Sequence, residues 1–309
     1  MAPTDNQMRA SDRGSTLLGR PSGVGLSFGA LTFGIIVASA TPVLVAGATL
    51  EGLAVSAWRV WIAGIVYAIV TVARRRVTWH SLRATALAGL AFGLATALFF
   101  TALQLTSVAN ATVIAVMQPL MLLVAGRLMF GERIALGDLG WVSVALTGAV
   151  FMVLAADSAG SSDLGGDLLA AGSMFLGAGY FIFGKRARES LDTVVFMTGL
   201  LLWTTVVITP IVLVSGQTLA PPDSEEWLRL ACLGLIVVFG HGLINFANGR
   251  LPLSAMGLFQ LLVPVCAGLL AWLFLDQRIS IWQASGMGVV LVSLGAHTRH
   301  TARSDRLQT

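Results

Sequence analysis

The sequence predicts an all-α integral membrane protein in which ten transmembrane helices form two inverted five-helix repeats. Three observations lead to this prediction: the 309 residues are 56% hydrophobic, only 11% of them are charged, and the apolar residues form long continuous runs. A soluble domain carries about 25% charged residues, so this chain cannot cover a water-facing surface of its size. Runs of about 20 apolar residues suit membrane-spanning helices and are too continuous for β-barrel strands.

Charged and turn residues divide the chain into ten predicted spans. The spans cover residues 27–47, 54–73, 84–103, 109–130, 138–155, 166–184, 194–215, 229–248, 254–275 and 281–298. The connections, such as ARRRVTWHSLR and GQTLAPPDSEE, are too short to form a separate soluble domain. The first apolar run is too long for a signal-peptide core, so we expect the first helix to be retained.

The distribution of positive charge predicts the orientation. With ten crossings, 16 of the 19 Lys and Arg residues fall on the side of the two termini, and only Arg59, Arg229 and Arg278 fall on the other. Cytoplasmic segments of membrane proteins are enriched in Lys and Arg, so we expect both termini to be cytoplasmic and the membrane to be the inner (plasma) membrane. The excess of Lys and Arg over Asp and Glu then reflects the topology and contact with the lipid bilayer, and no nucleic-acid partner is expected.

A repeated pattern links the two halves. Pro119 and Pro264 lie 145 residues apart, and the same offset pairs Arg133 with Arg278. Each copy reads as a helix with a central proline, a charged turn and a glycine-rich helix. Two consecutive units of five spans must be inverted because five is odd. Inverted repeats are the architecture of secondary transporters, whose substrate site lies near the membrane midplane between the halves.

The repeat also sets the predicted domain boundaries. These are a cytoplasmic tail at 1–25, a first repeat at 26–156, an outside linker at 157–163, a second repeat at 164–298 and a cytoplasmic tail at 299–309.

The stretch TALQLTSVANATVIAVMQPLMLLVAGRLMFGERIALGDLGWVSVALTGAV resembles the EamA module of the drug/metabolite transporter superfamily. The resemblance lies in the proline, the Gly-Glu-Arg turn and the glycines that follow. The second copy, LPLSAMGLFQLLVPVCAGLLAWLFLDQRISIWQASGMGVVLVSLG, has Asp276-Gln277-Arg278 in place of Gly-Glu-Arg. The resemblance covers nearly the whole chain and implies a ten-helix transporter. Within the superfamily the chain is most similar to bacterial amino-acid and metabolite exporters, including the YddG-type aromatic amino-acid exporters.

The positions of the charged residues restrict the cargo. Every Asp and Glu falls at a predicted span end, in a loop or in a tail, and Arg59, Arg127 and Arg229 fall toward span ends. An exporter of cationic drugs usually needs an intramembrane acid, and an unpaired buried charge is costly. We therefore expect a net neutral or zwitterionic cargo, such as an amino acid or similar metabolite, exported by alternating access. The alternatives are a multidrug or cation exporter of the same superfamily and an intramembrane lipid-modifying enzyme.

Uncharged polar and aromatic side chains within the spans are the candidates for lining a substrate cavity. His241 and Asn245 are four residues apart and so share one helical face. The full set is His241, Asn245, Gln260, Tyr180, Gln118, Gln104, Phe99, Phe100 and Trp203. His241 is the only titratable group that we place well inside a span. It has either a packing role or a cavity role. Export is either downhill or weakly coupled to protons through His241.

The hinge and gating candidates are Pro119, Pro264, Glu132, Arg133 and Arg278. Proline frees a backbone carbonyl and lets a helix bend, and the charged turns can fix how one helix leads into the next. No metal-ligand spacing and no nucleotide fingerprint occur in the sequence, so we expect no metal, no cofactor and no enzymatic activity. We expect a monomer.

Overall fold

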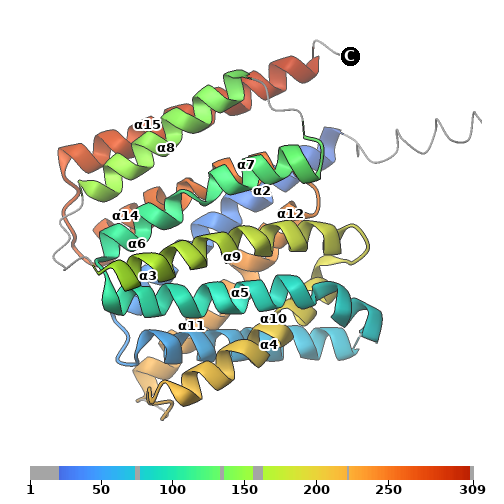
Figure 1. The fold of residues 1–309 in the computed structure, drawn as a ribbon, viewed down its shortest axis with the longest axis vertical. Helices are drawn as coiled ribbons and strands as arrows, with labels where there is room; N and C mark the ends of the chain where they lie inside the picture. Colours follow the sequence, from blue (N-terminus) through green and yellow to red (C-terminus); the bar gives the residue numbers. More distant parts are fainter. Residues whose placement is uncertain (1–20, 74–76, 133–135, 156–162, 221–222, 307–309) are drawn as a thin grey trace, which may run out of the picture.

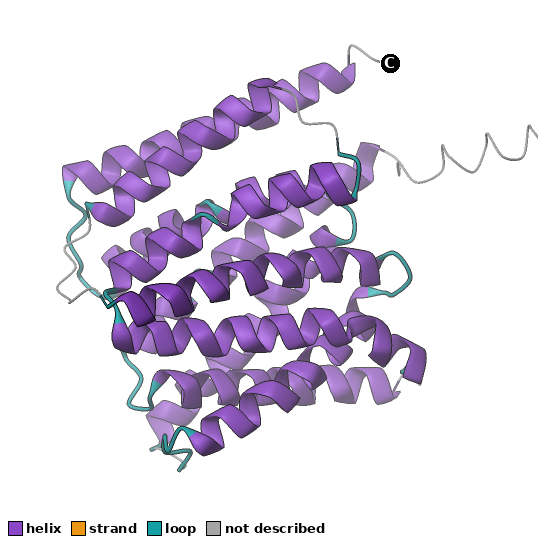
Figure 2. Cartoon of the chain, viewed as in Figure 1, coloured by secondary structure: helices purple, strands orange, loops and turns teal. Residues whose placement is uncertain are grey.

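The computed structural model describes residues 21–73, 77–132, 136–155, 163–220 and 223–306. In these ranges all regular secondary structure is helical (Figure 2). The first half contains α2 (Pro21–Ala38), α3 (Thr41–Ala46), α4 (Gly52–Ala73), α5 (Trp79–Leu105), α6 (Val108–Val116), α7 (Gln118–Met129) and α8 (Leu136–Leu154). The second contains α9 (Leu164–Arg188), α10 (Thr193–Val214), α11 (Ser224–Ile236), the π-helical turn η1 (Val237–His241), α12 (Gly242–Asn248), α13 (Leu253–Gln260), α14 (Leu262–Phe274) and α15 (Ile281–Arg306).

Eight helical segments of the described chain are long and apolar enough to cross a membrane. Two further apolar runs, Leu139–Leu154 in α8 and Ile281–Ala296 in α15, are shorter. The prediction of ten spans therefore stays a prediction, as does the orientation of the termini. Several predicted spans are broken helices: α6 is separated from α7 at Met117, and α13 from α14 at Leu261.

The first helices of the two halves run in opposite directions. In Figure 1, α2 begins at the right of the view and runs to the left, whereas α9 begins at the left and runs to the right. The start of α2 and the end of α15 consequently lie on the same side of the molecule. This arrangement agrees with an inverted repeat.

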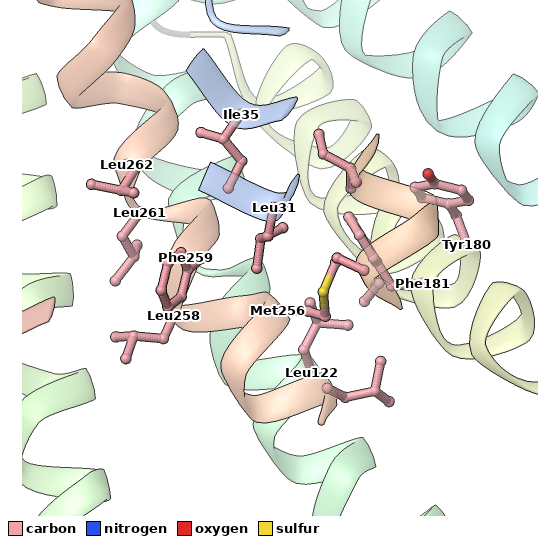
Figure 3. Packing of buried hydrophobic residues seen from close by; sticks show 14 of the residues in the cluster. Leu31, Ile35, Leu122, Tyr180, Phe181, Met256, Leu258, Phe259, Leu261 and Leu262 are labelled. Carbon is pink, nitrogen blue, oxygen red and sulfur yellow. The ribbon is translucent and has the colours of Figure 1, made fainter. Parts of the chain in front are cut away.

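The halves interlock instead of packing as separate bundles. Helix α5 of the first half packs along α9 and α10 of the second. In the reciprocal arrangement, η1 and α12 pack on α2, and α11 packs on α4. The main hydrophobic core therefore forms between the halves: Figure 3 shows Leu31 and Ile35 of α2 beside Met256 and Phe259 of α13.

The offset of 145 residues extends to helix starts that the sequence reading did not pair. Thr78 caps α5 by accepting a hydrogen bond from the Ser81 N–H (3.2 Å), and Asp223 caps α11 by accepting one from the Glu226 N–H (2.9 Å). Such caps satisfy amide groups that a helix leaves unpaired at its start.

Two glycines at the same offset lie in close contacts between the halves. A Cβ on Gly89 of α5 would lie 2.5 Å from the Trp203 Cβ and 2.7 Å from the Leu200 carbonyl oxygen of α10. A Cβ on Gly234 of α11 would lie 2.5 Å from the Ile62 Cγ2 of α4. Only glycine allows these helices to approach so closely.

Helices α8 and α15 pack mainly against each other, along one edge of the molecule (Figure 1). Gly148 and Gly286 face each other in this contact, where a Cβ on Gly286 would lie 2.8 Å from the Gly148 carbonyl oxygen.

Candidate functional site

A π-helical turn lies where the two halves meet. In η1 the backbone hydrogen bonds change register, and such turns occur frequently at functional sites. The Tyr67 hydroxyl of α4 donates to the Val238 carbonyl of η1 (2.9 Å), so a residue of the first half satisfies a carbonyl of the second. Gly240 lies against Gly34 of α2, where a Cβ on Gly34 would be 2.9 Å from the Gly240 carbonyl oxygen. The turn is thus held from two sides by the first half.

Three of the predicted cavity residues meet at the end of this turn. The Asn245 amide of α12 donates to the Tyr180 hydroxyl of α9 (2.6 Å) and to the His241 carbonyl (2.9 Å). Asn245 is fully buried, and neither its Oδ1 nor the His241 Nδ1 has a hydrogen-bond partner in the described part of the chain. Buried polar atoms are rarely left unpaired, so these two atoms are candidates for contact with a cargo or water.

An aromatic side chain that the sequence reading missed completes this group. The Phe92 ring of α5 lies 4.8 Å from the Tyr180 ring and 5.3 Å from the His241 ring, between centroids. We call Tyr67, Phe92, Tyr180, His241 and Asn245 the central cluster. It combines residues of both halves, and Phe92 could have been found in the sequence from its spacing of seven residues from Phe99 on one helical face.

Arg59 occupies a position that the sequence reading did not anticipate. We expected it toward a span end, but α4 begins at Gly52, which places Arg59 two turns inside the helix, roughly 10 Å from its start. The side chain is only 8% exposed, and its guanidinium carbon lies 5.6 Å from the centre of the Phe100 ring. The structure therefore places Arg59 two residues farther from the helix start than the predicted span 54–73 does, and buries its side chain.

The predicted cavity residues of α5 are Phe99, Phe100 and Gln104, and they lie on the part of α5 near Glu51. The Phe99 and Phe100 rings contact each other at 6.2 Å, nearly perpendicular. Gln104 is exposed and lines a pocket of about 590 Å³ together with Glu51 and with Gln217, which follows α10. Phe100 also lies against Gly52 and so borders both Arg59 and the segment that leads to this pocket.

Three other predicted cavity residues lie apart from the central cluster. The Trp203 indole N–H donates to the Leu82 carbonyl (2.8 Å) in the contact between α5 and α10. The Gln118 amide lies against Gly177 of α9, and Gln260 ends α13 at its break. Within the described ranges none of the three hydrogen-bonds to the central cluster.

The hinge candidates divide into two groups. Pro119 and Pro264 lie at the second and third residues of α7 and α14, directly after the helix breaks, where a missing N–H costs little. Arg278 is exposed in the turn after α14. Arg133 lies outside the described residues.

Glu132 joins the two halves. Its carboxylate accepts hydrogen bonds from the Leu253 N–H (2.6 Å), the Ser254 N–H (3.0 Å) and the Ser254 hydroxyl (2.8 Å), and so caps the start of α13. The Lys185 ammonium lies 3.9 Å from the same carboxylate and donates to the Leu251 carbonyl (2.6 Å). We call these contacts of Glu132 with α13 and Lys185 the Glu132 clamp.

The comparisons with known proteins agree with this architecture. The model of the EamA-like transporter family matches the chain twice, over residues 25–154 and 164–296. A solved protein crystal structure superimposes with a TM-score of 0.75 at 21% sequence identity, covering 91% of this chain and 98% of its own. At that identity the likeness shows the fold alone. No curated protein matches the chain.

Proposed function

The chain belongs to the EamA-like transporter family and is a multi-pass membrane protein; on this premise we propose that it exports small neutral or zwitterionic metabolites, with amino acids the foremost candidates. The similarity of its sequence motifs to the YddG-type exporters supports aromatic amino acids among them. The proposed membrane is the bacterial inner membrane, with both termini in the cytoplasm and a monomer as the working unit.

The chemistry of the central cluster supports this cargo. Its polar groups are a phenol pair, an imidazole and an amide, and they lie among aromatic rings. Such a lining suits a small molecule with both an apolar part and hydrogen-bonding groups. The buried guanidinium of Arg59 disfavours a cationic cargo, because like charges repel strongly where water is scarce.

One observation above the others supports alternating access. The interface between the two halves, which we call the seam, differs between its two ends. At one end α7 packs on α13 and the Glu132 clamp joins them. At the other end α14 packs on α2 and α3, whereas α6 packs on α9 and α8. A carrier that exposes its site to one side at a time needs a seam that is closed at one end while it is open at the other.

Transport by purified protein in liposomes tests the proposal. A competition panel would set aromatic, aliphatic, acidic and basic amino acids against a quaternary ammonium ion. We expect saturable uptake with competition by neutral amino acids. Competition by the quaternary cation alone would overturn the proposed cargo, and rapid non-saturating flux would overturn the carrier mechanism.

A further inference from the structure

Arg59 lies on the face of α4 that is directed toward the centre of the molecule. Ser56, Arg59, Ala63 and Tyr67 follow one another at spacings of three and four residues, so they form one stripe along the helix. Tyr67 reaches η1 from this stripe through its hydrogen bond to the Val238 carbonyl (2.9 Å). Arg59 therefore belongs to the same interior region as the central cluster.

This guanidinium has no partner of opposite charge among the described residues. Across the described ranges no carboxylate lies within salt-bridge distance of it, and its buried Nε makes no hydrogen bond. One turn earlier on the same face, the hydroxyl of the fully buried Ser56 also lacks a partner. The Phe100 ring supplies a cation–π contact but accepts no hydrogen bond from the guanidinium.

The other arginines held within the fold are satisfied differently. Arg188 is equally buried, and its guanidinium donates to the Asn245 carbonyl (3.3 Å), the Thr193 hydroxyl (2.8 Å) and the Leu191 carbonyl. Arg229 pairs with Glu225 and Glu226. Both have the partners expected of a structural arginine. Of these three arginines, Arg59 alone has a buried guanidinium nitrogen, Nε, without a hydrogen-bond partner in the described part of the chain.

The second half shows that the helix packing does not require an arginine. Gly234 of α11 contacts Ile62 and the backbone of Arg59, in the same way that Gly89 of α5 contacts Trp203 and the backbone of Leu200. The backbones of Arg59 and Leu200 therefore play the same part in the two helix contacts. Leucine fills one position without any charge, so the charge at the other calls for a separate reason.

We propose that Arg59, with the Ser56 hydroxyl beside it, binds the carboxylate of a small organic acid or zwitterion, while the Phe100 ring flanks the apolar part of the same molecule. This inference rests on the proposed transport function and names the group of the cargo that the protein recognises. A carboxylate fits because a guanidinium offers it two parallel N–H donors, and because binding removes the unpaired charge.

Binding to purified protein tests the inference without transport. The probes are L-phenylalanine, 3-phenylpropionate, which lacks the amine, and L-phenylalaninamide, which lacks the carboxylate, with tryptophan fluorescence as the readout. We expect both acids to bind the unaltered protein, and Arg59→Gln to weaken their binding by about 10- to 100-fold. Arg59→Gln should not weaken binding of the amide, which has no carboxylate and whose ammonium group is relieved of a like charge. Arg59→Lys should recover part of the affinity for the acids.

Two controls separate this outcome from loss of folding and from failure of the proposed function. Arg83→Gln removes an exposed cation near the start of α5 and should leave all three affinities unchanged. Size-exclusion profiles show whether Arg59→Lys and Arg59→Gln are folded. The inference is overturned if neither acid binds, or if Arg59→Gln weakens acids and amide equally or not at all. Arg59-dependent binding without uptake into liposomes would support this site and refute transport.

Discussion

The turn after α7 and the turn after α14 can be compared residue by residue, because they lie 145 residues apart. The N–H groups of Phe130 and Glu132 both bond to the Gly126 carbonyl (3.2 and 3.0 Å). The N–H groups of Leu275 and Gln277 bond to the Ala271 carbonyl in the same pattern (2.9 and 3.4 Å). Between each pair lies a residue with positive φ, Gly131 at 64° and Asp276 at 52°. Both helices thus end in the same left-handed cap.

The side chains of the two turns do different things. Glu132 crosses the seam and caps α13, whereas Gln277 at the same position is exposed and makes no side-chain hydrogen bond in the described part of the chain. The start of α6, which Gln277 would cap by symmetry, is capped locally by Ser107 (3.1 Å to the Asn110 N–H). The repeat therefore determines the backbone at both ends, while single side chains decide which end is joined.

The largest effect that we predict is at the Glu132 clamp. Glu132→Ala removes three charge-assisted hydrogen bonds and leaves the Leu253 N–H without its partner, so it should lower the free energy of unfolding by about 3 kcal/mol. Gln277→Ala is the matched control and should change it by less than about 0.5 kcal/mol. Unfolding of the purified variants in detergent measures both. Equal effects at the two positions would contradict the assignment of the clamp to one end.

The paired glycines should respond unequally to the same added methyl group. Gly89→Ala directs a Cβ at a backbone carbonyl and at the Trp203 Cβ, whereas Gly234→Ala meets only the Ile62 side chain at close range. We expect a cost of about 3 kcal/mol at Gly89 and about 2 kcal/mol at Gly234, because the added Cβ at Gly89 meets a backbone carbonyl as well as a side-chain Cβ. The same unfolding assay tests this order, and the reverse order would refute the packing described here.

The central cluster offers a third comparison, because His241 lies 145 residues after Thr96 and so occupies the equivalent position in the second repeat. Of these two side chains only the imidazole is titratable. If transport is weakly coupled to protons, His241→Ala should reduce the stimulation of uptake by a pH gradient a few-fold, and Thr96→Ala should not. Stimulation that persists unchanged in His241→Ala would exclude this histidine as the coupling group.

The smallest predicted effect concerns the two positive-φ residues. Asp276→Gly should stabilise the protein by about 0.5 kcal/mol, because glycine adopts this conformation without steric cost. Gly131→Asp should destabilise it by a similar amount. Unfolding midpoints of the two variants check the signs, and a loss of stability in Asp276→Gly would point to a role for its carboxylate.

Much of this symmetry could be predicted from sequence. The shared offset of Pro119 and Pro264 indicated the repeat, and the structure extends it to helix caps, glycines and turns. His241, Asn245 and Tyr180 could be grouped because polar residues are few in such a chain, and the structure places them in contact.

The faces of the helices could not be predicted in the same way. Apolar residues surround most of these spans, so their periodicity does not show which side meets the centre. Trp203 was consequently expected in the cavity but packs between α5 and α10, and Gln118 lies against α9. The start of α4 was predicted to within two residues, but the sequence did not show that the Arg59 side chain would be buried without a partner.

Distances between the halves test the central claim most directly, namely that the seam is closed at the Glu132 end and opens there only as the other end closes. Spin labels at Met129 and Arg250 report one end, and labels at Val108 and Phe274 report the other; all four residues are exposed. Cys232 and Cys266 would first be replaced by serine. In Glu132→Ala, double electron–electron resonance should show the distance between positions 129 and 250 lengthening and the distance between positions 108 and 274 shortening. Two distances that stay fixed, or that change in the same direction, would contradict the account.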